Sequence, residues 1–212
     1  MEIKSFVFNP FYENTYVVVS EKKNCLIFDP GCYEDYEIEE LKTFILLNDL
    51  KVQAIINTHC HIDHVLGNDP LKTLYKVPLK IPINEQEVFG SIPAYAPHWG
   101  INGYRHAEVD EYLEEGQTLT LDEIEMQLIE VPGHSPGHLM YYIELEKCMN
   151  GGDVLYRESI GRTDLPGGNH QDLLQNIQQK VYTLPEDVEV LPGHGPSTTI
   201  GHEKQYNPFV KG

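Results

Sequence analysis

The sequence predicts an α/β protein in which two mixed β-sheets pack between outer helices, an αββα sandwich. The chain has two halves, and each half runs through several short strands before a helix and a further strand. Layers of sheet and helix are among the few stable architectures for such a pattern. Its 212 residues fit one compact domain, and a hydrophobic content of 41 % can fill a core. No linker divides the chain, so we predict a single domain over residues 1–212.

The first half opens with three strands and then alternates helix and strand. The three strands are separated by turn signals rich in Asn, Pro and Gly. They cover residues 3–8, 16–19 and 25–28. A helix over 36–50 follows, because Ile38, Leu41 and Ile45 recur on one face. Residues 52–57 read as a short buried strand.

A second helix is predicted from Asp63 to about Tyr75, despite Pro70. The stretch 84–116 has no clear period and holds several aromatic residues, among them the only tryptophan, Trp99. Two interpretations stay open for this stretch. It is either a mobile loop over a pocket or an irregular connection with buried rings.

The second half repeats the pattern from residue 117 onward. Four strand-like segments cover residues 119–121, 125–131, 139–145 and 147–154. Residues 172–184 read as a helix, because Leu173, Ile177 and Val181 recur at four-residue spacing. Residues 188–191 form a last strand, and the tail from Gly201 adds a short helix.

The composition limits the possible partners and the compartment. Thirty-three acidic against 15 basic residues give a net charge of −18, which repels nucleic acid and anionic membranes. No apolar run approaches the roughly 20 residues that span a bilayer. The N-terminus shows no signal-peptide pattern, so the expected location is cytoplasmic and the expected partner a small molecule.

The four cysteines match neither a zinc knuckle nor a dense disulfide framework. Cys25 and Cys148 lie in apolar strand-like runs and are expected to be small buried residues. Cys60 lies between two histidines that are candidate metal ligands. We interpret it as a filler of that position and not as a nucleophile.

The strongest chemical signal is the segment 58–64, Thr-His-Cys-His-Ile-Asp-His. His59, His61, Asp63 and His64 fall at the end of an apolar strand, and imidazole and carboxylate are the ligands that zinc and related metals prefer. In an extended loop His59 and His61 project to the same side. If a helix starts near Asp63, then Asp63 and His64 point to a second position. The segment can therefore serve two metal ions.

Three further candidates follow later strands in glycine-rich turns: His134, Asp153 and His194. Glycine lets the backbone approach closely and adopt unusual dihedral angles, which suits a ligand at a strand end. One such residue alone would be unremarkable as a surface or core residue. All three together with the 58–64 segment make coincidence a poor explanation.

These motifs resemble the signature of the metallo-β-lactamase superfamily, and within it most the glyoxalase II-type hydrolases and their short single-domain relatives. The H-x-H-x-D-H run at 59–64 carries the resemblance, which extends over nearly the whole chain. Its supporting marks are Asp29-Pro30-Gly31, Gly161-Arg162-Thr163-Asp164 and Pro192-Gly193-His194-Gly195-Pro196. The metal motif is specific for the superfamily and much less so for the substrate.

The resemblance implies a two-metal site. It assigns His59, His61 and His134 to one metal ion, assigns Asp63, His64 and His194 to the other, and makes Asp153 a bridging carboxylate. Asp63 and Asp153 are then the catalytic carboxylates, and the implied nucleophile is a metal-bound hydroxide. The expected cofactors are two divalent ions, zinc first, with iron or manganese as alternatives.

For the residues around the ligands, the sequence leaves more than one role open. Asp29 either accepts the second ring N–H of a ligand histidine or opens a turn. His138 is expected to support the turn around His134. Arg162 lies where glyoxalase II-like enzymes carry a basic residue that contacts the thiol carrier, and a structural ion pair with Asp164 is the rival interpretation. The remaining histidines are expected at the surface: His98, His106, His170 and His202.

The leading functional hypothesis is hydrolysis of a thioester such as S-lactoylglutathione. The chain ends soon after His194, so it is expected to lack the C-terminal helical domain that supplies glutathione contacts in longer members, and another thiol carrier is possible. The alternative is a persulfide dioxygenase with one iron held by His59, His134 and Asp153. Lactonases and other hydrolases of the superfamily stay open. A non-enzymatic scaffold would need only four ligands, whereas seven are present.

Overall fold

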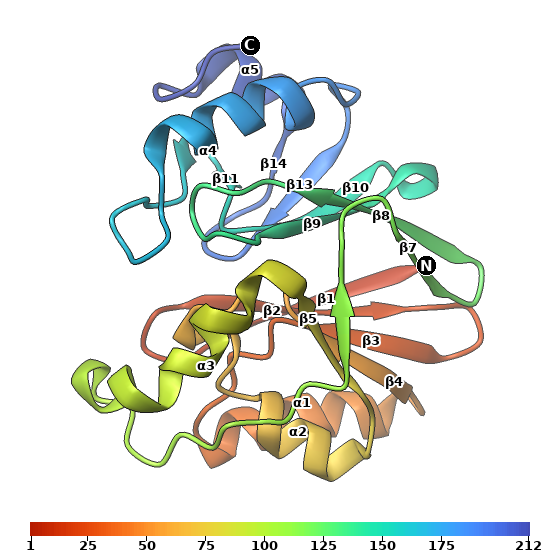
Figure 1. Ribbon diagram of the computed structural model, residues 1–212. Helices are drawn as coiled ribbons and strands as arrows, with labels where there is room; N and C mark the ends of the chain where they lie inside the picture. Colours follow the sequence, from red (N-terminus) through yellow and green to blue (C-terminus); the bar gives the residue numbers. More distant parts are fainter. The chain divides into compact units, whose positions relative to one another are not determined.

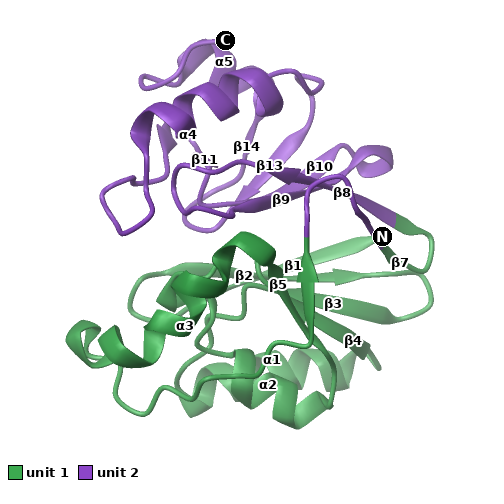
Figure 2. Ribbon diagram, in the orientation of Figure 1, with its two compact units in different colours: residues 1–113, 120–124 green, residues 114–119, 125–212 purple.

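The computed structural model describes all residues from 1 to 212 and divides into two compact units (Figure 2). The first unit comprises residues 1–113 and 120–124, and the second comprises residues 114–119 and 125–212. Each unit is built around one six-stranded sheet with helices against it (Figure 1). The single domain over residues 1–212 stays a prediction.

The sheet of the first unit has the strand order β1-β2-β3-β4-β5-β6. Its first three strands form an antiparallel meander, and β3 to β6 pair in parallel through crossover connections. The strands are β1 (Glu2–Phe8), β2 (Glu13–Val19), β3 (Asn24–Phe28), β4 (Lys51–Ile56), β5 (Leu79–Pro82) and β6 (Glu111–Leu113). The three predicted N-terminal strands are confirmed, and β2 begins three residues earlier than expected.

Helices α1 (Asp35–Leu47) and α2 (Asn68–Tyr75) lie against one face of this sheet (Figure 1). Leu41 and Ile45 of α1 are buried in the core, which confirms the periodic face. The Glu37 side chain accepts the backbone N–H of Glu34 (2.9 Å) and so caps the first turn. The helix ends before the predicted residue 50, at Leu47.

The predicted helix from Asp63 to about Tyr75 is wrong in its first turn. Residues Ile62–His64 form a 3-10 turn, and α2 begins only at Asn68. The bond that would carry a helix across this point is not made, because the Asp63 carbonyl accepts from Asn9 Nδ2 (2.9 Å) and the Gly67 N–H donates to the Pro30 carbonyl (2.7 Å). Pro70 falls in the first turn of α2, where its missing N–H costs nothing.

The stretch 84–116 is more regular than either interpretation of it supposed. It contains α3 (Gln86–Tyr95), a 3-10 turn at Ala96–Trp99 and strand β6. Phe89 and Ile92 of α3 are 2 % and 0 % exposed and belong to the hydrophobic core of the first unit. Their burial overrides the weak helix propensity of Gly90 and Pro93. The structure therefore favours a packed connection over a loop without regular structure.

The sheet of the second unit has the order β14-β13-β10-β9-β8-β7. β8, β9 and β10 are antiparallel neighbours, while β13 runs parallel to β10. The strands are β7 (Thr118–Leu121), β8 (Ile124–Glu130), β9 (Leu139–Ile143), β10 (Cys148–Gly152), β13 (Glu189–Pro192) and β14 (Thr198–Thr199). The predicted strands are confirmed with small shifts at their ends.

Helix α4 (His170–Asn176) continues as a π-helical turn over Ile177–Val181 and packs on this sheet. It begins two residues earlier than predicted, because the Asn169 side chain caps it by accepting the N–H groups of Gln171 and Asp172. The short C-terminal helix is confirmed as α5 (Ile200–Tyr206). A small hairpin of β11 (Leu155–Tyr156) and β12 (Ser159–Ile160) was not predicted. None of the helices combines the length and apolar character needed to cross a bilayer.

Candidate metal centre

The carboxyl end of β4 in the first unit presents four of the predicted ligands. His59 and His64 are fully buried, and His61 is 8 % exposed. The Asp63 side chain is 15 % exposed, and the Asp63 backbone carbonyl accepts a hydrogen bond from the Asn9 side-chain amide. The rings of His59 and His61 meet edge to face, with centroids 4.8 Å apart. The first unit thus gathers three imidazoles and one carboxylate within a single loop.

Thr58 determines which ring nitrogen of His59 carries the proton. Its hydroxyl donates to Asp29 Oδ2 at 2.7 Å and lies 3.0 Å from His59 Nδ1. A carboxylate can only accept, and the hydroxyl has one proton, so His59 Nδ1 is the donor in the second contact. The Nε2 lone pair of His59 is then available to a metal ion.

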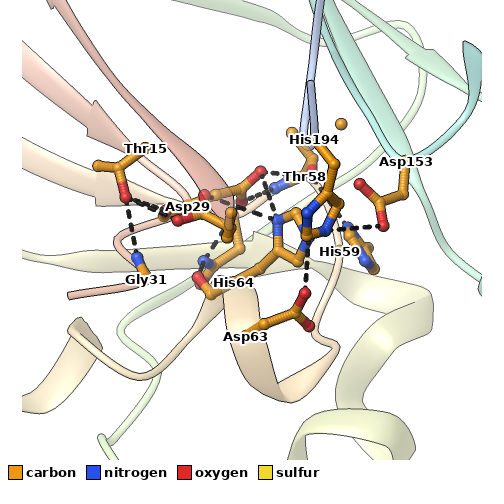
Figure 3. Close-up of polar contacts among 12 residues, drawn as sticks. Thr15, Asp29, Gly31, Thr58, His59, Asp63, His64, Asp153 and His194 are labelled. Carbon is orange, nitrogen blue, oxygen red and sulfur yellow. Dashed lines mark hydrogen bonds and ion pairs between the residues drawn. The ribbon is translucent and has the colours of Figure 1, made fainter. Parts of the chain in front are cut away.

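His64 directs its two ring nitrogens toward different carboxylates (Figure 3). Nδ1 lies 3.3 Å from Asp29 Oδ2, and Nε2 lies 3.7 Å from Asp63 Oδ2. Two ligands of one tetrahedral ion with bonds of about 2.0–2.1 Å lie about 3.4 Å apart. His64 Nε2 and Asp63 therefore have a separation that suits a common metal ion.

Asp29 fulfils both roles that the sequence left open. Its backbone has a φ of +46° at the turn before Pro30, and its carboxylate accepts the N–H and the O–H of Thr58, each at 2.7 Å. The same carboxylate faces His64 Nδ1 (Figure 3). Asp29 thus organises the 58–64 loop and orients a histidine in it.

In the second unit the carboxylate of Asp153 lies between two imidazoles. Oδ2 of Asp153 is 3.4 Å from His134 Nε2 and 3.6 Å from His194 Nε2. All three residues follow strands of the sheet, after β8, β10 and β13. One carboxylate oxygen of Asp153 thus lies at about a ligand–ligand separation from each of two histidines.

The backbone around the β11–β12 hairpin fixes these ligands. His134 Nδ1 donates to the Arg162 carbonyl at 2.7 Å, which leaves Nε2 as the ligand atom. The Asp153 N–H donates to His138 Nε2 at 3.0 Å, so the His138 side chain supports the turn of Asp153, whereas the sequence had predicted support for the turn around His134. Gly161 packs so closely that a Cβ there would lie 1.9 Å from the Asp153 carbonyl oxygen. Only glycine fits at residue 161.

The donor sets of both units fit divalent metal ions. Separations of 3.4–3.7 Å between neighbouring donors match those of one coordination sphere. His59 and His134 each have one ring nitrogen committed to a hydrogen bond, which leaves the other as a ligand. Histidine and carboxylate accept zinc, iron and manganese alike.

Comparison with known proteins places the chain in a family. The family model described as the metallo-beta-lactamase superfamily matches residues 8–194. The chain belongs to this superfamily.

Two curated relatives match over nearly their full lengths. The chain is 36 % identical to the probable metallo-hydrolase YqgX of Bacillus subtilis, covering 96 % of this chain and 94 % of that protein. It is 33 % identical to the hydroxyacylglutathione hydrolase GloC of Haemophilus influenzae, covering 99 % and 98 %. Among solved structures, the BLEG-1 B3 metallo-beta-lactamase aligns with a TM-score of 0.90 at 36 % identity, covering 100 % of both chains. TTHA1623 in a di-iron-bound form aligns with a TM-score of 0.86 at 32 % identity, covering 98 % of this chain and 100 % of that one.

Membership in the metallo-β-lactamase superfamily confirms the predicted fold class, two mixed sheets with helices. The chain is a metal-dependent hydrolase of this superfamily, whose members bind divalent metal ions. Zinc as the metal, the assignment of each ligand to an ion and the substrate stay predictions.

Arg162 forms the ion pair that was the rival interpretation. Its Nε and Nη2 donate to the two carboxylate oxygens of Asp164 at 2.7 and 2.9 Å. These bonds hold the pKa of Asp164 down to about 2. The guanidinium is half exposed. Contact of Arg162 with a substrate stays a prediction, while its carbonyl bond to His134 is a role that the sequence did not reveal.

Two buried carboxylates near the 58–64 loop escaped the sequence interpretation. Glu85 accepts the Cys60 N–H at 2.9 Å, and Glu13 lies 3.9 Å from His64 Nδ1. Burial raises the pKa of Glu13 well above its usual range, although the nearby His64 opposes this shift. In a chain with 33 acidic residues, no local signal separates these two from solvated ones. The four histidines expected at the surface belong to no group of metal-type donors: His98, His106, His170 and His202.

Cys60 is fully buried, and burial raises the pKa of its thiol well above the usual range. Only the thiolate is nucleophilic, so the structure supports the filler interpretation. We expect Cys60→Ala to keep hydrolytic activity within a few-fold of the wild type and native Cys60 to resist iodoacetamide. Steady-state kinetics and mass spectrometry of the alkylated protein check both. A loss of activity of about 100-fold in a folded, metal-loaded variant would show that Cys60 takes part in the chemistry.

Proposed function

We propose that this chain hydrolyses thioesters of small hydroxy acids, of the S-lactoylglutathione type, at a centre of two divalent ions. In the assignment that the family resemblance implies, His59, His61 and His134 would hold one ion, and Asp63, His64 and His194 would hold the other. Asp153 would be a ligand of both. The observation that carries this proposal is the position of Asp153 Oδ2, 3.4 Å from His134 Nε2 and 3.6 Å from His194 Nε2, two histidines that the proposal gives to different ions.

The ligand set also supports two ions over one. A persulfide dioxygenase with a single iron uses only His59, His134 and Asp153. A single iron would not need Asp63 or His64 as ligands. Their donor atoms nevertheless lie 3.7 Å apart, a separation that suits two ligands of one ion. The similarity to GloC, a hydroxyacylglutathione hydrolase, supports a thioester as the substrate.

The proposed reaction gives separate roles to the metal ions, to the residues that orient their ligands and to Arg162. Two divalent ions, zinc in our proposal, would supply Lewis acidity and would activate a water as the nucleophile. Asp29 and Thr58 hold His59 and His64 in the orientation that binding needs. Arg162 exchanges its internal partner Asp164 for a carboxylate of the thiol carrier, which the bidentate geometry of a guanidinium permits. The substrate is a small molecule, and the acidic surface repels nucleic acid and anionic membranes.

Release of thiol from S-lactoylglutathione by the purified, metal-loaded protein tests this function, beside a His59→Ala variant. We expect rapid release by the wild type and a loss on the order of 10³-fold in the variant, because metal catalysis is worth several kcal/mol. Metal content is measured on both proteins. No release from a wild type that holds its metal would reject this substrate, and oxygen consumption with a persulfide would then be the next assay.

A further inference from the structure

Glu13 opens β2 with a carboxylate that is fully buried beside a predicted metal ligand. The side chain is 0 % exposed, and its strand is buried along its whole length. A buried carboxyl group is costly unless it is paired or hydrogen-bonded. The buried Glu13 side chain therefore needs a hydrogen-bonding or charged partner that offsets the free energy of its desolvation.

One oxygen of Glu13 has a clear partner, and the other has none among hydrogen bonds. Oε2 lies 2.9 Å from the Thr15 hydroxyl, which lies equally close to the Asp29 carbonyl oxygen and has one proton for the two acceptors. The same hydroxyl accepts the Gly31 N–H at 2.9 Å (Figure 3). A Cβ at residue 31 would lie 2.1 Å from Oε2, so the carboxyl group fills the space beside Gly31. Oε1 makes no hydrogen bond and lies 3.9 Å from His64 Nδ1.

The other carboxylate beside His64 is already engaged. Oδ1 of Asp29 accepts the Thr58 N–H at 2.7 Å, and Oδ2 accepts the Thr58 hydroxyl at 2.7 Å. His64 Nδ1 lies 3.3 Å from that same Oδ2. A histidine that binds metal through Nε2 carries its proton on Nδ1 and needs an acceptor there. Glu13 Oε1 is a second carboxyl oxygen near this nitrogen, at 3.9 Å, and it makes no hydrogen bond elsewhere.

We propose that Glu13 is a positioning residue for the second metal ion: its Oε1, 3.9 Å from His64 Nδ1, adds to Asp29 a second carboxyl oxygen that faces this ring nitrogen and orients the imidazole electrostatically. Loss of this carboxyl oxygen weakens the ion held by Asp63, His64 and His194 and spares the other ion. The proposal rests on the two-metal centre of the proposed function. It goes beyond that function by naming a residue that touches neither metal nor substrate.

The test measures zinc binding, not turnover. Glu13→Leu keeps the volume without an acceptor, and Glu13→Gln keeps a carbonyl oxygen at the same place. We expect Glu13→Leu to raise the Kd of the second zinc equivalent about 10- to 100-fold, the usual effect of losing a group that supports a ligand. The first equivalent should be unchanged, and Glu13→Gln should bind both within a few-fold of the wild type. Chelator competition and elemental analysis give these values.

Glu203→Gln is the matched control. Glu203 is also fully buried and accepts from the Glu158 N–H and the Asn207 amide, neither of which belongs to a predicted ligand. We expect this variant to lower the melting temperature of the metal-free protein without selective loss of one zinc ion. If Glu13→Leu fails to fold, Thr15→Val removes the hydroxyl that holds Glu13 and should weaken the second ion in the same direction.

Three results would overturn the role of Glu13: two tightly bound ions in Glu13→Leu, equal weakening of both ions, or a Gln variant as weak as the Leu variant. A wild type that binds only one ion would instead overturn the two-metal centre, and this inference with it. Zinc titration of the wild type therefore separates the two failures.

Discussion

Asp153→Asn is expected to lower kcat/KM for thioester hydrolysis by about 10³-fold or more. The Asp153 side chain is almost fully buried, and its Oδ2 lies within 3.6 Å of both His134 Nε2 and His194 Nε2. An amide has the same shape but no charge, so it bridges two cations poorly. Metal catalysis is worth several kcal/mol, and each 1.4 kcal/mol is about a tenfold change in rate.

Elemental analysis of the Asp153→Asn protein should show fewer bound ions than the wild type. Asp187→Asn is the control, because Asp187 is an exposed residue of the same unit that pairs with Lys147. That variant should keep both its metal and its rate. Full activity in Asp153→Asn with two bound ions would contradict a bridging role for Asp153.

Gly161→Ala is expected to damage the metal centre through a single methyl group. The added Cβ would lie 1.9 Å from the Asp153 carbonyl oxygen and 3.0 Å from His134 Nδ1. The nearest atom is backbone, so the hairpin has to shift, and such overpacking costs about 1–3 kcal/mol. Because the same segment accepts from His134 through the Arg162 carbonyl, the shift reaches two ligands. We expect zinc affinity to fall at least about 10-fold, with a larger loss in kcat/KM.

Gly90→Ala is the matched control for Gly161→Ala. Gly90 lies in α3, and a Cβ there would meet nothing within 4 Å. The change should raise stability by about 0.4–1 kcal/mol through the unfolded chain and leave zinc binding alone. Thermal unfolding of metal-free and zinc-loaded protein gives both quantities. If Gly161→Ala kept wild-type zinc affinity, the close packing of Gly161 against Asp153 would not be needed for metal binding.

The elements were predicted well wherever the chain has a strong period. Strands β1, β3, β4 and β8 and the helices α1 and α4 follow from alternation or from apolar residues on one face. The errors lie where contacts between residues far apart in sequence decide the local structure. The helix expected from Asp63 fails because Asn9 and Pro30 take the groups that would extend it. Helix α3 was missed because burial of Phe89 and Ile92 outweighs the local effect of Gly90 and Pro93.

The candidate ligands were evident from the sequence because their chemistry is local. His59, His61, Asp63 and His64 stand within six residues, and His134, Asp153 and His194 each stand in a glycine-rich turn after a strand. Side-chain type and spacing are enough to show that a metal can be held. They also fix the family, since the resemblance depends on these same positions.

What surrounds the ligands was decided only by the tertiary structure. Thr58 and the Arg162 carbonyl set the protonation of His59 and His134, and Glu13 and Asp29 lie behind His64. Hydrogen bonds between residues far apart in sequence leave no periodic pattern in the sequence. A buried glutamate cannot be distinguished from a solvent-exposed one by sequence alone, because its burial depends on the packing of its strand. The sequence by itself therefore identifies the candidate metal ligands of this protein, whereas the folded chain determines how each of them is oriented.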